Sequence, residues 1–362
     1  MKRKTKKIVF AVFLTVVLTL VLGLFFVWQK KLGFRVRVSQ VADQASFKQQ
    51  QSAVLLSQVE SDLPRSPISG LACANALRRP IAVMLSGDAR TRPLSGLSEA
   101  DLIVEMPVTP LGEGSITRTM AVYVCADPPE IGSVRSARHP FIPLALGLDA
   151  IYAHWGGSHF ALDILKSGVI DNLDALPNPF NAFYRKAGIP MPDNGFTSMS
   201  RLLAASKKMG YRLESKFSGY PHFSAGEISQ GSGQAKTLTI GYPGQFKVRF
   251  DYHPETNSYL RFRADAKEID KNTGKQVEAK NIVVMRVKNL PLEGQYNDIK
   301  IEGSGQAEYY INGERTDGKW SKDAKDKKSK LFFYDNNGQE IKFALGQIWV
   351  EIVDFSQSVN WE

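Results

Sequence analysis

Cysteine and histidine are scarce in this chain. It has two cysteines and five histidines among 362 residues. Two cysteines cannot build a disulfide-dense scaffold or a four-cysteine zinc site. The signatures H-E-x-x-H, C-x-x-C, G-x-x-x-x-G-K-S/T and G-x-S-x-G are also absent from the sequence. This removes the usual sequence evidence for zinc proteases, thiol oxidoreductases, P-loop proteins and α/β-hydrolases. We therefore expect no metal and no cofactor, and the sequence leaves open whether the chain is an enzyme.

Beyond its first 37 residues, the chain lacks an excess of positive charge. The formal net charge is +10, but residues 1–37 hold nine Lys or Arg and no Asp or Glu. The rest of the chain has 37 basic and 36 acidic residues. Proteins that bind DNA or RNA usually carry their basic excess on the folded domain. We therefore expect no nucleic-acid partner.

Residues 8–28 contain no charged side chain. A run of 21 residues is long enough to cross a hydrocarbon core of about 30 Å. The basic tail before it, residues 1–7, predicts a cytoplasmic N-terminus. No small-residue cleavage site and no lipid-acceptor cysteine follow the run, so we favour an uncleaved signal anchor over a cleaved signal peptide. The expected localisation is the cell membrane, single-pass, with the remainder of the chain extracytoplasmic.

The fold class expected outside the membrane is α+β, in two domains behind a stalk. The stalk covers residues 29–66, with coiled-coil association as an alternative. Strand-like and helix-like segments then alternate over residues 67–226, which predicts a mixed α/β domain. Its predicted strands lie at 81–85, 100–108, 117–124 and 150–155. One predicted helix, SHFALDILKSG, has Ser158 as N-cap and Gly168 just past its end. Another, SMSRLLAASKKMG, has Lys207 and Lys208 in its last turn before Gly210.

The last part of the chain is predicted to be almost wholly β. A Gly/Ser/Gln-rich linker covers residues 227–235, and residues 236–362 hold strand-like segments separated by turn signals. Asn337-Gly338 is the strongest hairpin signal among them. We expect an antiparallel β-rich domain here.

A ligand-binding site is predicted around GSVRSARHP (132–140). If this segment enters a helical turn, Arg135 and Arg138 lie on one side and can clamp a carboxylate or phosphate. The alternative is that they pair with acidic residues of their own domain. Arg92, before a proline, and Arg118, at the start of a strand, are added to the candidate ligand-binding residues.

The segment AIYAHWGGSHF (150–160) extends that candidate site. A strand ends at His154-Trp155, and Gly156, Gly157 and Ser158 lead into a helix. Strand ends that feed helix N-termini are the usual ligand side of α/β sheets. Trp155 is suited either to stacking on a sugar or to filling the core, and a single histidine such as His154 is more often a core residue than a catalytic one.

Glu105 lies inside a predicted apolar strand. A buried carboxylate is costly unless it is paired, so Glu105 needs a partner. We favour a structural pair with an arginine. The alternative is general acid/base catalysis by Glu105 together with His154.

Cys73 and Cys125 both lie in the predicted extracytoplasmic part. One cysteine pair in an oxidising compartment can form a disulfide. The alternative is two buried free thiols.

The chain resembles the YerB-like family of bacterial envelope proteins. The residues that carry this resemblance span roughly 67–355 and include RRPIAVML, RPLSGLSEADLIVEMPV, GSITRTMAVY, IGSVRSARHPFIPLALGLDAIYAHWGGS, NGFTSMSRL, GSGQAEYYINGERTDGKW and FFYDNNGQEIKFALGQIWVEIV. The resemblance implies a mixed α/β domain followed by a β-rich domain, and it implies no settled activity. Many relatives are lipoproteins, whereas this chain has no cysteine to accept a lipid after its apolar run.

These observations leave three hypotheses for function. The first is a binding or scaffolding module for an anionic, peptidoglycan-derived ligand, which needs arginines for carboxylates and an aromatic ring for sugars. The second is a cell-wall hydrolase or lyase that uses Glu105 and His154. The third is a protein-interaction module that uses an exposed strand edge, with an envelope protein as partner.

Overall fold

A computed structural model describes residues 17–32, 63–112, 114–224, 227 and 234–362. Residues 17–32 form a helix with exposed side chains. None of the helices in the described ranges is both long and apolar enough to span a membrane. The predicted basic tail, the first part of the predicted span over 8–28, and most of the predicted stalk and linker fall outside the described residues. The transmembrane anchor therefore stays a prediction.

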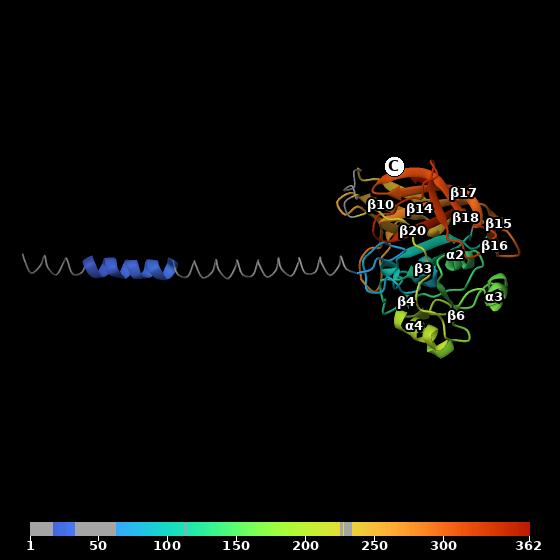
Figure 1. Cartoon of the computed structure of the whole chain (residues 1–362), viewed down its shortest axis with the longest axis horizontal. Coiled ribbons are helices and arrows are strands. Elements are labelled where there is room, and N and C mark those ends of the chain that lie inside the picture. The colour runs from blue at the N-terminus through green and yellow to red at the C-terminus, as the bar shows by residue number, and fades with distance from the viewer. Residues whose placement is uncertain (1–16, 33–62, 113, 225–226, 228–233) are drawn as a thin grey trace, which may run out of the picture. The chain divides into compact units, whose positions relative to one another are not determined.

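Residues Pro64–Glu362 form one unit built around a ten-stranded sheet (Figure 1). The order of its strands is β19-β18-β17-β14-β20-β2-β3-β1-β5-β6. The N-terminal part of the unit contributes β1 (Ile81–Ser86), β2 (Leu102–Pro107), β3 (Thr117–Tyr123), β5 (Ile151–His154) and β6 (Asn172–Asp174). The C-terminal part contributes β14 (Asn281–Val287), β17 (Gly303–Ile311), β18 (Glu314–Lys322), β19 (Phe332–Asp335) and β20 (Ile348–Asp354).

Smaller sheets and helices cover this central sheet. The second sheet has six strands: β9 (Thr237–Ile240), β10 (Val248–His253), β11 (Ser258–Arg263), β12 (Ala266–Lys267), β13 (Glu278–Ala279) and β21 (Val359–Trp361). A three-stranded sheet contains β4 (Ile131–Gly132), β7 (Tyr184–Arg185) and β8 (Gly195–Thr197), and a hairpin pairs β15 (Asn289–Pro291) with β16 (Asn297–Ile299). The helices of the unit are α2 (Phe141–Gly147), α3 (His159–Lys166) and α4 (Met199–Lys208), and its single turns are η1 (Ala89–Thr91), η2 (Leu97–Glu99), η3 (Pro179–Asn181) and η4 (Gly244–Phe246).

The central sheet separates two apolar cores. Successive side chains of a strand point to opposite faces, so Val104 of β2 lies in one core and its neighbour Ile103 in the other. Helices α2 and α3 and strand β16 add side chains to the first core. Helix α4 and the six-stranded sheet add side chains to the second core. We call the two sides of the sheet the helix face and the small-sheet face.

The local elements of the N-terminal part agree with the sequence predictions. Strands β1, β2, β3 and β5 begin and end within two residues of the predicted ranges. The Ser158 side chain accepts a hydrogen bond from the Ala161 amide at α3, and Ser198 does the same for Arg201 at α4. Side-chain oxygens at these positions satisfy amides that the first turn of a helix leaves without partners.

The C-terminal part is β-rich as predicted, but it is not a separate antiparallel layer. Strand β20 pairs in parallel with β14 and with β2 of the N-terminal part, so one sheet contains strands of both parts. The turn at Asn337-Gly338 forms, yet the chain after it makes only the single bridge Tyr334–Glu340. Phe343 instead pairs with His222, so the predicted hairpin is a turn without a second strand.

Candidate functional site

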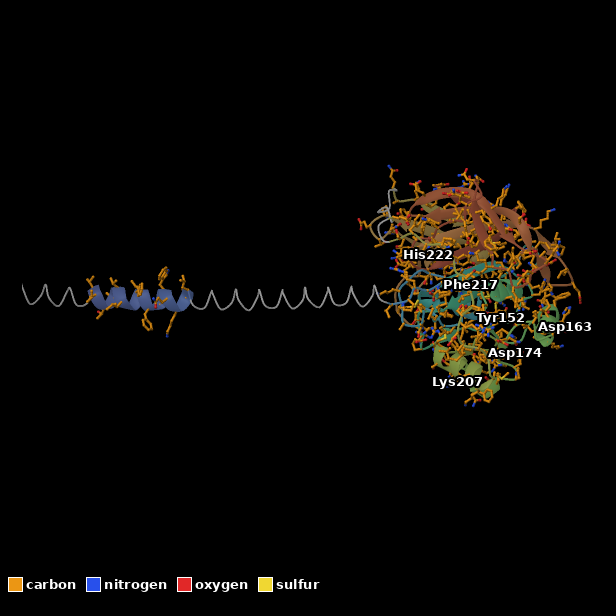
Figure 2. The ribbon with its side chains drawn as sticks, viewed as in Figure 1. Tyr152, Asp163, Asp174, Lys207, Phe217 and His222 are labelled. Atoms are coloured by element: carbon orange, nitrogen blue, oxygen red, sulfur yellow. A yellow bond between two sulfur atoms is a disulfide. The ribbon has the colours of Figure 1, made fainter. Side chains whose placement is uncertain are left out.

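The carboxyl ends of several strands meet at one edge of the central sheet. Strands β2, β1, β5 and β6 run in the same direction, and β3 runs in the opposite direction between β2 and β1. The first residues of β3 therefore lie at the same edge as the last residues of β1, β5 and β6. Tyr152 on β5 and Asp174 on β6 mark this region in Figure 2. The crevice outside such carboxyl ends is where open α/β sheets usually bind ligands.

Arg118 of β3 lies at this edge, on the helix face of the sheet. Its residue exposure is 4%. Its Nη1 donates to the Thr117 carbonyl oxygen at 3.0 Å and lies 3.6 Å from Asp88 Oδ2. Its Nε is buried without a hydrogen-bond partner among the described residues. Burial, followed by the positive charge of Arg135, lowers the pKa of Arg118 to about 9. An anionic ligand that binds beside Asp88 would therefore contact a largely buried guanidinium.

Arg135 lies beside Arg118 and is held by acidic residues. Its Nη1 donates to Asp193 Oδ1 at 2.5 Å, and its Nη2 lies 3.9 Å from Asp88 Oδ2. The other oxygen of Asp193 pairs with Arg90 Nε at 2.8 Å. The backbone of Arg135 joins the ends of β1 and β5. Its amide donates to the Met84 carbonyl oxygen, and its carbonyl oxygen accepts from the Trp155 amide. The Arg135 guanidinium is thus paired mainly with Asp193 and Asp88 of its own domain.

Arg138 has fewer polar partners than Arg135. Its Nη1 donates to the Ala137 carbonyl oxygen at 3.1 Å, and its guanidinium carbon lies 5.7 Å from the centre of the Tyr296 ring. It forms no ion pair with any residue that the structure describes. Its positive charge contributes to lowering the pKa of Arg118, so the two side chains are electrostatic neighbours. The sequence placed Arg135 and Arg138 on one side only if this segment enters a helical turn. The segment instead forms bridges at Val134 and Ala137, and helix α2 begins only at Phe141.

We call Arg118, Arg135 and Arg138, together with Asp88 and Asp193, the arginine site. Asp193 is shared between Arg135 and the more exposed Arg90. Arg118 lies 3.6 Å from Asp88, and both Asp88 and Asp193 favour its charged form. The site thus has three arginines and two carboxylates. The arginine site therefore carries uncompensated positive charge, which suits the binding of an anion.

Arg92 does not belong to the arginine site, contrary to the sequence prediction. Its Nε lies 2.6 Å from Glu268 Oε1 on the small-sheet face, and its Nη1 donates to the Ser86 carbonyl. Burial and the nearby Arg263 lower its pKa to about 9. Arg92 faces away from Arg118 because the chain passes from β1 into η1 and crosses the edge of the sheet.

Glu105 is a structural residue with arginine partners, as favoured from the sequence. Its Oε2 accepts from Arg261 at 2.5 Å and from Arg263 at 2.6 Å, and the Thr117 hydroxyl donates to its other oxygen. Burial favours its neutral form, but Arg263 and Arg261 outweigh burial and lower the pKa of Glu105 to about 2. Glu105 therefore stays ionised.

The partners of Glu105 belong to a charge cluster that is buried except at Arg92, whose side chain is 14% exposed. It joins strands β2, β11 and β20, and its six members are Arg92, Glu105, Arg261, Arg263, Glu268 and Glu351. Three positive and three negative side chains are formally balanced. Burial and the negative charge of Glu105 raise the pKa of Glu351 to about 7. We call this group the buried charge cluster.

Glu105 and His154 cannot act as an acid/base pair on one substrate. Glu105 points to the small-sheet face, whereas His154 points to the helix face. Their strands are three positions apart in the sheet, which corresponds to about 14 Å. His154 is fully buried, with Nδ1 2.8 Å from the Gly156 carbonyl and Nε2 3.2 Å from Asn172 Oδ1. It is a hydrogen-bonded core residue.

The residues after His154 also have structural roles. The Trp155 ring lies between Phe183 and Arg185 and packs against Gly195, on the opposite side from Arg118. Gly156 has a φ of +60° and its amide donates to Asp174. A Cβ on Gly157 would lie 3.2 Å from the Ala137 side chain. The two glycines thus let residues 135–137 pack against the end of β5, and Ser158 caps α3.

Cys73 and Cys125 form a disulfide bond. It ties the segment before β1 to the end of β3. Asp101 fastens the same region, because it accepts hydrogen bonds from the amides of Val124 and Cys125. No group of three or more potential metal ligands occurs within the described ranges.

Sequence reasoning missed several residues of both clusters. Asp88 and Asp193 lie in loops and carry no local signal. Glu351 could have been found, because it interrupts the apolar run QIWVEIV as Glu105 interrupts LIVEMP. Arg261 and Arg263 are buried, whereas the apolar residues that alternate with them, Leu260 and Phe262, are less so. The alternation in SYLRFR predicts the opposite, with Leu260 and Phe262 inside, so the sequence held no signal for two arginines in the core.

Two family models match the chain. The first, described as "Protein of unknown function (DUF3048) N-terminal domain", matches residues 68–212, and the second, for the corresponding C-terminal domain, matches residues 238–350. The chain is 28% identical over 296 residues to the "Putative lipoprotein YerB" of Bacillus subtilis (strain 168), covering 80% of this chain and 86% of that protein. It is also similar to the crystal structure of the YerB protein from Bacillus subtilis. That match has a TM-score of 0.72 and 26% identity, and it covers 82% of this chain and 99% of that chain.

Proposed function

Because this chain belongs to the YerB-like family, we propose that it is a membrane-anchored extracytoplasmic protein of the bacterial cell envelope that binds an anionic ligand at its arginine site. The ligand class that we favour is a carboxylate-bearing fragment of the cell wall. The protein acts in this proposal as a binding or scaffolding module.

Two observations support the location. The name of the Bacillus subtilis relative describes a lipoprotein, which is a protein held at a membrane by a lipid. The Cys73–Cys125 disulfide is typical of oxidising compartments outside the cytoplasm. In this chain the uncharged run over 8–28 takes the place of a lipid as the proposed anchor.

One observation carries the binding function. Arg118 and Arg138 lie at the carboxyl edge of the sheet, and neither has a carboxylate within hydrogen-bonding distance among the described residues. Arginines that are buried for structural reasons are normally paired, as Arg261 is with Glu105. Arg138 has no ion pair among the described residues, and the Arg118–Asp88 pair, at 3.6 Å, is too long for a hydrogen bond. Both planar guanidiniums therefore keep donors for bidentate binding of a carboxylate or phosphate.

The hydrolase hypothesis loses its mechanism in this structure. Its two candidate groups, Glu105 and His154, lie on opposite faces of the sheet, and each is engaged by other residues. Binding without turnover is therefore the function that the geometry supports best.

The experiment is a co-sedimentation assay. The full chain in detergent micelles is mixed with isolated cell-wall sacculi, and the pelleted protein is quantified for the wild type, for Arg138→Gln and for Arg249→Gln. Arg249 is a matched control because it is ion-paired with Asp251 on β10, outside the arginine site. We expect the wild type and Arg249→Gln to pellet and Arg138→Gln to remain in solution. Equal pelleting of all three proteins would show that sacculi bind elsewhere than at the arginine site. Pelleting of none would reject the cell-wall ligand and leave a protein partner as the next hypothesis.

A further inference from the structure

Asp88 is the acidic residue of the arginine site that lies near both Arg118 and Arg135. Its Oδ2 lies 3.6 Å from Arg118 and 3.9 Å from Arg135, and the Ser86 hydroxyl donates to the same oxygen at 3.0 Å. The Asp88 amide donates back to Ser86 Oγ, so the carboxylate is held in place from two directions. Its Oδ1 has no hydrogen bond to any residue of the described ranges.

A simple anion does not complement this arrangement. An anion on Arg118 would lie close to the Asp88 carboxylate, which is 3.6 Å from the same guanidinium, and would be repelled by it. The repulsion disappears when the ligand also presents a positively charged hydrogen-bond donor to Asp88. The complement of two guanidiniums and one carboxylate is a ligand with two anionic groups and one ammonium group.

We propose, resting on the proposed function, that the arginine site takes an acidic amino acid or a peptide end that has a free ammonium group, with its carboxylates on Arg118 and Arg138 and its ammonium on Asp88. Asp88 is then the residue that determines specificity for a ligand with an ammonium group. Glutamate and glutarate test it directly, because the two molecules share both carboxylates and only glutamate carries an ammonium group.

The test is isothermal titration calorimetry of the full chain in detergent micelles with D-glutamate, L-glutamate and glutarate. We expect one glutamate enantiomer to bind about tenfold or more tightly than glutarate, since a hydrogen-bonded charge pair contributes roughly that factor. Asp88→Asn should weaken glutamate binding and strengthen glutarate binding, because it removes both the attraction and the repulsion. Arg138→Gln should weaken both ligands at least about tenfold, and the control Arg249→Gln should change neither.

The outcomes separate this inference from the proposed function. Glutarate binding as tightly as glutamate, or an Asp88→Asn variant that weakens both ligands equally, would overturn the role of the ammonium group while an anion site remains. Binding of neither molecule, together with sacculus binding that Arg138→Gln abolishes, would overturn the ligand class alone. Binding of neither, with sacculus binding insensitive to Arg138→Gln, would overturn the arginine site itself. Thermal unfolding of each variant verifies that it is folded before titration.

Discussion

Glu105 of β2 and Arg261 of β11 are 156 positions apart in the chain, yet their side chains meet at 2.5 Å with both fully buried. The contact connects the central sheet to the six-stranded sheet. Arg261 also stacks over the Trp349 ring at 4.0 Å, so the ion pair is enclosed by aromatic packing. The N-terminal and C-terminal family segments therefore share one electrostatic centre as well as one sheet.

The Glu105 ion pair should be essential for stability. Glu105→Gln removes the carboxylate that both Arg261 and Arg263 contact and leaves the buried cluster with more positive than negative charges. Breaking a buried ion pair typically costs about 3–5 kcal/mol. We expect a loss of that size in the free energy of unfolding, measured by urea denaturation. Glu255→Gln, at an exposed position, is the control and should change stability by less than about 0.5 kcal/mol. A loss below about 1 kcal/mol for Glu105→Gln would contradict the assignment.

The stability of the protein should fall as the pH rises through neutrality, because of Glu351. Its pKa in the folded state is about 7, raised above the ordinary value of 4.5 by burial and by Glu105. The folded state thus binds this proton more tightly than the unfolded state does, so the stabilisation is complete below pH 4.5 and is lost as the pH rises through 7.

The measurement is the free energy of unfolding of the wild type and of Glu351→Gln between pH 5 and pH 8. Glutamine imitates the protonated side chain, so the variant should lack this part of the pH dependence. Burial lowers the pKa values of His139 and His222, which gives a trend of the opposite sign in the same range, but both proteins share it. Parallel stability curves for the two proteins would show that Glu351 does not titrate in this range.

The disulfide bond should stabilise the unit that begins at Pro64. Cys73 and Cys125 are 52 positions apart, and a cross-link that closes a loop of this length is worth about 4 kcal/mol in the chain-entropy model. We expect the Cys73→Ala/Cys125→Ala double variant to unfold at a lower temperature than the oxidised wild type. Added reductant should lower the melting temperature of the wild type toward that of the variant. A reductant effect of equal size on the double variant would mean that another process is being measured.

His154 should matter for stability and not for ligand binding. Its ring is buried and bonded to Gly156 and Asn172, so His154→Phe leaves buried polar groups without partners at a cost of about 1–3 kcal/mol. The folded variant should still pellet with sacculi as the wild type does. A variant that keeps its melting temperature but loses sacculus binding would show that His154 takes part in ligand binding.

Parts of the fold were predictable because their signals are local. Strands β1, β2 and β3 follow from short runs rich in β-branched residues, and α3 follows from its Ser158 cap and the glycine after its end. The need of Glu105 for a buried partner followed from its apolar neighbours alone. These inferences use only the periodicity of side chains and the hydrogen-bonding needs of backbone ends within a few residues.

Errors arose where the outcome depended on which face of the sheet a side chain occupies. Arg92 and Arg118 were grouped together, yet the chain turns Arg92 to the small-sheet face and leaves Arg118 on the helix face. His154 and Trp155 are adjacent in sequence, and the pleat of the strand sends them to opposite sides. The order of strands in the sheet then decides which of these side chains can share a ligand.

The sequence alone determined the secondary structure near the predicted site and the requirement that Glu105 be paired. The tertiary structure alone decided that Arg261 and Arg263 meet that requirement, that Asp88 stands beside Arg118, and that one sheet runs through both family segments. The reason is physical. Caps and periodicity act over a few residues, whereas the partner of a buried charge is whichever opposite charge the long-range pairing of strands brings into contact.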